Sequence, residues 1–284
     1  SMRRPSNRRP NARHPARRGQ GLMPRRIIIH AGFHKTGTST IQQTLRENRV
    51  ALKKHLALRL RWHMRDLVSA TRGYSTWRDP LTLIKVQDRF TTLMNELPGM
   101  PRRTLIISGE ELAGHLPGRG DLDDYSAAPV LLYAFWEIMT KRYPAAEILL
   151  YLSTRAPDAW LTSAHWEHVK ASNMTMDVDA FCDRYHRAAN LDEMVTEIAS
   201  RVPCPVHHTA LEACRDLPLG PADPLLDLCD LPLALRTELA APPPANTRLG
   251  DDVLKAMIEA SKAHSAPDAR NTAKAAILAE ARKL

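Results

Sequence analysis

Short, almost wholly apolar runs alternate along the chain with longer stretches in which apolar residues recur every three or four positions. The short runs at 26–30, 104–108 and 147–153 predict buried strands, and 205–209 is a fourth, proline-flanked candidate. The longer stretches predict helices at 38–50, 79–97, 129–142, 156–171, 177–187, 190–201, 250–264 and 268–284. We therefore expect a three-layer α/β/α domain with a central, mainly parallel sheet.

Composition supports a globular chain whose excess positive charge is confined to one end. Of the 284 residues, 44% are apolar and 25% charged, which is enough to bury a core. The formal charge is +9, yet residues 1–26 hold nine arginines and no Lys, Asp or Glu. Outside that stretch, 31 basic residues face 31 acidic ones. A basic, nucleic-acid-reading domain is therefore not expected.

The basic stretch is rich in Arg, Pro, Asn and Gly and cannot supply a packed core. We expect residues 1–24 to form a disordered basic tail, with Ser1-Met2 as an expression scar and Met23 as an alternative start. Attraction of the tail to an anionic surface is the other interpretation. Residues 25–284 are expected to form one catalytic domain.

No apolar segment reaches the length of a membrane span, and none follows the basic start as in a secretory signal. The four cysteines have no CxxC spacing, which is typical of reduced thiols in a cytosolic protein. We therefore expect a cytoplasmic protein with no metal site.

The loop between the first strand and the first helix has the composition of an anion site. Gly32 and Gly37 allow a tight turn and a close backbone approach, while Lys35 adds a positive charge. Unpaired N–H groups at the start of a helix bind phosphate-like groups. The expected binding residues in this loop are Gly32, Lys35, Thr36, Gly37, Thr38, Ser39 and Thr40.

The loop differs from the GxxxxGK[ST] loop of nucleotide triphosphatases, because Lys35 precedes Gly37 instead of following it. An acid suited to Mg²⁺ at the end of an apolar strand is also missing. A nucleotide or small-molecule kinase of the P-loop type is kept as the alternative function.

The order His30-x-Gly32-x-x-Lys35-Thr36-Gly37-Thr38-Ser39-x-x-Gln42 resembles the 5′-phosphosulfate loop of sulfotransferases that use 3′-phosphoadenosine-5′-phosphosulfate (PAPS), especially bacterial ones. The resemblance implies a P-loop-NTPase-like sulfotransferase fold. It also implies metal-independent transfer of a sulfuryl group from PAPS to a hydroxyl or amine. Adenosine 3′,5′-bisphosphate (PAP) would be the second product.

A second segment fits the same family. Arg155 follows the apolar run at 147–153, and Ser163 lies eight residues later on the next predicted helix. A guanidinium and a hydroxyl held in this way can bind one phosphate from two sides. The arrangement is similar to the 3′-phosphate site of these sulfotransferases. Arg248, in a late loop that resembles a cofactor-covering segment, is a further candidate for that phosphate.

Transfer to an alcohol needs a base for the acceptor proton and a cation for the leaving oxygen. Lys35 suits the second role. The segment 105–112 resembles a strand-Ser-x-Glu segment of the family, in which Glu110 matches the glutamate. Glu111 and His34 remain alternative bases. The expected catalytic residues are Lys35, Glu110 and His34.

The acceptor is left open between a small molecule, a carbohydrate and a lipid headgroup. We expect residues 55–80, 113–128 and 165–180 to form its cleft. Trp160 and Trp166 are assigned first to packing, and to adenine or acceptor contact second. A non-catalytic module that binds RNA or another polyanion through its tail is a third hypothesis.

Overall fold

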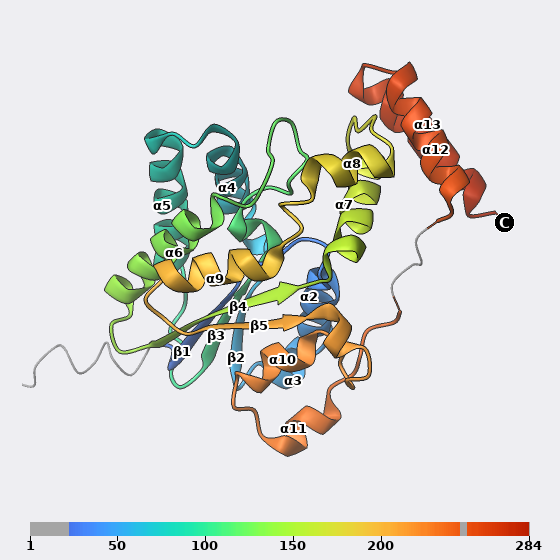
Figure 1. Ribbon diagram of the computed structural model, residues 1–284. Helices are drawn as coiled ribbons and strands as arrows, with labels where there is room; N and C mark the ends of the chain where they lie inside the picture. Colours follow the sequence, from blue (N-terminus) through green and yellow to red (C-terminus); the bar gives the residue numbers. More distant parts are fainter. Residues whose placement is uncertain (1–22, 245–248, 284) are drawn as a thin grey trace, which may run out of the picture.

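The computed structural model describes residues 23–244 and 249–283. Within these residues, five parallel strands form one sheet in the order β2-β3-β1-β4-β5 (Figure 1). Their bounds are β1 (Arg26–His30), β2 (Leu56–Arg59), β3 (Thr104–Ser108), β4 (Glu147–Thr154) and β5 (Val206–Ala210). The expected three-layer α/β/α class is therefore confirmed, and every strand pair is parallel.

Alternating side chains of the central strands enter two separate cores. Ile27 and Ile29 of β1 pack on one face of the sheet, whereas Ile28 packs on the other. The larger core is covered by α4 (Arg65–Trp77), α5 (Pro80–Asn95), α6 (Ala128–Arg142), α7 (Pro157–Ala171), α8 (Val178–Tyr185) and α9 (Leu191–Arg201). The smaller is covered by α2 (Thr38–Glu47), α3 (Arg49–Leu52), α10 (Ala222–Asp227) and α11 (Leu233–Glu238). Apolar runs that are buried on both faces are the reason why these strands were predictable.

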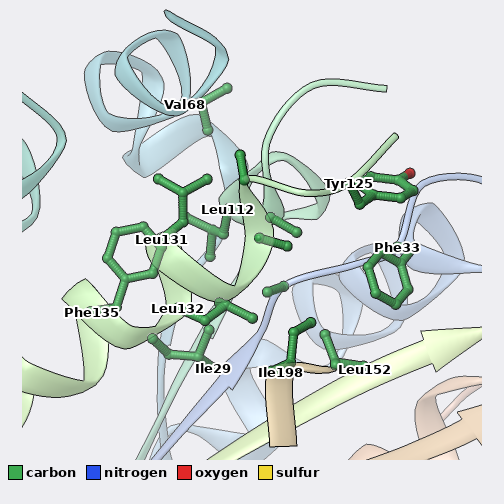
Figure 2. Close-up of a cluster of buried hydrophobic side chains, with 14 of the residues drawn as sticks. Ile29, Phe33, Val68, Leu112, Tyr125, Leu131, Leu132, Phe135, Leu152 and Ile198 are labelled. Carbon is green, nitrogen blue, oxygen red and sulfur yellow. The ribbon is translucent and has the colours of Figure 1, made fainter. Parts of the chain in front are cut away.

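The larger core continues to the carboxyl end of β1, where Phe33 packs on Tyr125 with ring centroids 4.8 Å apart (Figure 2). At the same end, His30 lies between the hydroxyls of Ser108 on β3 and Ser153 on β4, at 2.7 and 3.1 Å. The ends of three strands are thus joined through one buried imidazole. This rigid edge carries the loops described below.

Most predicted elements are confirmed, with two omissions. The fourth candidate strand appears as β5, shifted by one residue. Residues 55–80, which were expected only to line a cleft, contain β2 and α4, and sequence analysis predicted neither element. β2 is a four-residue edge strand whose last two residues are half exposed, so it lacks the apolar run of a central strand.

The chain ends in a hairpin of α12 (Asp251–Ala263) and α13 (Pro267–Ala281), packed on α7 (Figure 1). Short 3₁₀ turns η1 (Arg61–His63), η2 (Glu110–Ala113) and η3 (Leu211–Cys214) follow β2, β3 and β5. Lys274 of α13 is buried and donates to the carbonyls of Val169 and Ser172, which fixes the hairpin to the end of α7. No described helix has the length and apolar character needed to cross a membrane. Most of the expected tail, residues 1–22, lies outside the described residues.

Candidate functional site

The candidate site lies at the carboxyl ends of β3, β1 and β4. The loop after β1 leads to α2 on one face of the sheet, and the loop after β4 leads to α7 on the other. Ligands of open parallel sheets bind where neighbouring connections diverge in this way. A cavity of about 1280 Å³ opens at this edge, lined by residues of all three loops.

Two glycines shape the loop after β1. Gly37 has φ 92°, and a Cβ there would approach Leu211 to 2.9 Å, so a larger residue would be both strained and crowded. Gly37 precedes α2, and no side chain of the described residues caps the helix. Thr38, Ser39 and Thr40 form the first turn of α2 and line the cavity, which places a helix N-terminus where a phosphate-type ligand can bind.

Gly32 and Thr36 support the loop without lining the cavity. At Gly32, with φ 115°, a Cβ would come within 3.1 Å of the Glu110 carbonyl oxygen, so the two loops are in close contact. Thr36 is fully buried, and its hydroxyl donates to the carbonyl of Phe33. Its side chain is turned inward, and in this conformation Thr36 has no surface exposed to the cavity.

Lys35 projects into the cavity and pairs with Glu167 of α7 at 3.3 Å. Glu167 also pairs with Lys170 at 3.1 Å. Burial alone would raise the pKa of Glu167, but the two ammonium groups bring it below its ordinary value. Sequence analysis missed Glu167, although its position four residues after Ser163 places both on one face of α7.

Arg155 brings the second loop to the first. Its guanidinium donates to the carbonyl oxygen of Lys35 at 2.9 Å, and both residues line the cavity together with Ser163. The two segments that are more than one hundred residues apart in sequence therefore meet. Arg248 lies outside the described residues, and its expected contact remains a prediction.

The two candidate carboxylates after β3 have different surroundings. Glu110 is half-buried, lines the cavity and accepts a hydrogen bond from the Thr38 hydroxyl at 2.6 Å. Glu111 is 5% exposed, and its oxygens are engaged by Arg61 at 3.1 Å and by Arg72. Glu110 is thus the carboxylate that is available to a ligand.

His34 lines the cavity but is held by aromatic neighbours. Its Nδ1 lies 2.8 Å from the Tyr125 hydroxyl, and its carbonyl accepts from the Trp160 indole N–H at 2.9 Å. Burial, with weaker effects of nearby charges, lowers the pKa of His34 to about 3. A neutral imidazole with so low a pKa is a weak base at neutral pH. The packing role expected of Trp160 is confirmed by its complete burial, whereas Trp166 lines the cavity.

The cavity also collects residues from the three segments expected to form the cleft. Arg61 and Arg72 come from the first, His115 and Arg119 from the second, and Lys170 from the third. Sequence analysis did not assign these residues to the site individually, and Arg72 lies on α4, a helix that was itself not predicted.

His34, Glu110 and Glu111 together form one group that could hold a metal ion, with ligand atoms within 4.8 Å of one another. It is the only such group in the described part of the chain. Two guanidinium groups already engage Glu111, and their positive charge opposes a divalent cation there.

No protein-family model matches the chain, and no curated protein matches it in sequence. Among solved structures, the chain is similar to a sulfotransferase from Alicyclobacillus acidocaldarius, with 17% sequence identity and a TM-score of 0.45. The alignment covers 88% of this chain and 95% of that one. A likeness at this level assigns no residue, so the site rests on the contacts described above.

Proposed function

We propose that this chain is a PAPS-dependent sulfotransferase that acts on a hydroxyl or amine group without a metal ion. The observation that carries the proposal is the meeting of Lys35, Arg155, Ser163 and Glu110 around one cavity, with the Arg155 guanidinium 2.9 Å from the Lys35 carbonyl oxygen. Two anion-binding loops side by side suit a nucleotide with phosphates at both its 3′ and 5′ positions.

The residues divide the chemistry between them. Glu110 takes the proton of the acceptor hydroxyl, and the acceptor oxygen forms a bond to sulfur. The bond between sulfur and the 5′-phosphate oxygen breaks, and the electron pair leaves with PAP. Lys35 and the first N–H groups of α2 stabilise the charge on that oxygen, while Arg155 and Ser163 hold the 3′-phosphate.

Donor binding would replace an internal ion pair. Glu167 pairs with Lys35 at 3.3 Å. The phosphosulfate group offers Lys35 a second anionic partner, and Lys170 at 3.1 Å remains with Glu167 when Lys35 turns away. The pair thus keeps Lys35 oriented toward the cavity before the donor arrives.

The test is a thermal-shift series that needs no acceptor. PAP at about a hundredfold excess over its dissociation constant should stabilise the protein by about 2.7 kcal/mol, a rise on the order of 5 °C in melting temperature. Adenosine 5′-monophosphate, which lacks the 3′-phosphate, should stabilise it less. Equal shifts with both nucleotides, or no shift with PAP, would contradict the proposal.

ATP with Mg²⁺ tests the kinase alternative in the same series. A kinase would need a site for Mg²⁺, for which the cluster of His34, Glu110 and Glu111 is the candidate, although Arg61 and Arg72 oppose a cation there. A larger shift with ATP and Mg²⁺ than with PAP would support a kinase. A screen of hydroxyl compounds with ³⁵S-labelled PAPS then identifies the acceptor.

Lys35→Ala should lower sulfuryl transfer to that acceptor by about tenfold to a hundredfold, since one preorganised charge contact is lost. Lys141→Ala is the matched control, because it removes an exposed ammonium on α6, outside the cavity. The rates of labelled product formation are compared at saturating donor. An unchanged rate in Lys35→Ala would remove Lys35 from the mechanism.

A further inference from the structure

One further hollow adjoins the cavity at Glu110, and a second hollow adjoins the first. The first, about 960 Å³, shares Ser39, Arg61, Arg72 and Glu110 with the cavity. The second, about 920 Å³, continues along α3, β2 and η1. We call these two hollows the arginine groove, after its members Arg46, Arg49, Arg59, Arg61, Arg65, Arg72 and Arg103.

Most of these cations have no carboxylate partner. Of these seven arginines, only Arg61 and Arg72 form ion pairs within the described residues, both with Glu111. The other five, Arg46, Arg49, Arg59, Arg65 and Arg103, form none there. Among the described residues that line the groove, Glu47 and Glu110 are the only acids. Basic and acidic residues are equal in number outside residues 1–26, so the groove is a local concentration of charge.

Gathered arginines repel one another, and this repulsion is relieved by a bound anion. Burial, and then the nearby charge of Arg103, lowers the pKa of Arg59. Because the unpaired arginines extend over α2, α3, β2 and α4, one small anion would not reach them all. This spread of arginines favours a polymer with repeated negative groups as the ligand.

One aromatic side chain, that of Trp62, lies among the arginines of the groove. The Trp62 side chain is 43% exposed, and the Arg46 guanidinium lies 5.4 Å from the centre of its ring. An exposed indole is a flat surface on which a sugar ring can stack. Proteins that hold single-stranded RNA use several aromatics for successive bases, whereas Trp62 is the only Phe, Tyr or Trp among the groove's described lining residues.

We propose that the arginine groove binds an acidic polysaccharide and presents one of its hydroxyls to Glu110. The carboxylate or sulfate groups of the polymer pair with the arginines that form no ion pair, and one ring stacks on Trp62. Glu110, the candidate base, lines both the groove and the cavity, so a polymer bound in the groove reaches it. The catalytic part of this inference rests on the proposed function, whereas binding in the groove does not.

Hydrogen exchange of the full chain locates the polymer. Hyaluronate, with regularly spaced carboxylates, should slow exchange of backbone amides in residues 39–65, and neutral dextran should not. The arginines of residues 1–26 can attract any polyanion, but such binding would leave residues 39–65 unprotected. Absence of protection there overturns the proposal. Stronger protection by poly(U) than by hyaluronate would overturn the proposal and identify RNA as the ligand of the groove.

Paired variants test the arginines themselves. Arg49→Gln with Arg65→Gln removes two exposed groove cations, and Arg187→Gln with Arg201→Gln removes two exposed cations elsewhere. We expect the groove pair to weaken hyaluronate binding roughly tenfold, with the control pair unchanged. Equal weakening by the two pairs contradicts the proposal.

PAP binding separates this inference from the proposed function. Both double variants should keep the thermal shift of the unmodified chain with PAP. A normal PAP shift without polymer binding rejects the groove assignment alone. Polymer binding without a PAP shift keeps the groove and rejects the sulfotransferase.

Discussion

Glu110→Gln should lower sulfuryl transfer by about a hundredfold or more, because the amide cannot accept the acceptor proton. The Gln carbonyl can still accept the hydrogen bond that the Thr38 hydroxyl gives to Glu110 at 2.6 Å, so the loop geometry should be retained. The PAP thermal shift should therefore stay near that of the unmodified chain. Transfer is followed as labelled product at saturating PAPS.

Glu111→Gln is the matched control for this variant. Glu111 is buried between Arg61 and Arg72, so its loss should lower the melting temperature. The transfer rate of the protein that remains folded should change by less than about tenfold, because Glu111 is already engaged. If Glu111→Gln abolished transfer while Glu110→Gln did not, the two roles would be exchanged.

The second large effect is loss of stability in acid. Burial is the leading cause that lowers the pKa of His30 and His34 to about 3, and of His115 and His168 to about 4. The unfolded chain takes up these protons near pH 6.5, whereas the folded chain does not. Folding therefore weakens as pH falls from 6.5 toward the folded pKa values.

The size of this effect follows from His30 and His34, the two groups whose pKa values fall furthest. Each His contributes about 1.36 kcal/mol per pH unit, so His30 and His34 together remove about 5 kcal/mol between pH 6.5 and 4.5. That is comparable with the whole stability of a typical domain. Urea unfolding at several pH values measures it, with His208→Gln, an exposed histidine, as the control. A free energy of unfolding that stays constant from pH 7 to 5 would refute the prediction.

The three central strands were the clearest prediction, because their residues are buried on both faces. The runs of β1, β3 and β4 are apolar because helices cover them on either side, and the pattern is local. β2 escaped prediction because it is short and lies at the sheet edge after Lys53, Lys54 and His55. Because β2 was missed, the residues of α4 were assigned to a variable segment. Arg72, which lies on α4, was therefore not proposed as a site residue.

The candidate site, like the fold, could be predicted from the sequence only in part. The loops with Lys35 and Arg155 each follow a predicted strand, and parallel strands bring their carboxyl ends to one edge, so their proximity was predictable. Which carboxylate faces the cavity was not, because Glu110 and Glu111 are adjacent in sequence. Their difference arises from Arg61 and Arg72, whose positions depend on packing between distant segments.

The contact between Gly32 and the Glu110 carbonyl limits how this chain can be redesigned. Any residue with a side chain at position 32 would be strained at φ 115°, and its Cβ would lie 3.1 Å from the Glu110 carbonyl oxygen. Attempts to enlarge the cavity would therefore do better to vary its helical walls than the turn after β1. Library design should keep position 32 fixed and diversify residues such as Trp166 of α7 and Leu278 of α13, which line the cavity from helices.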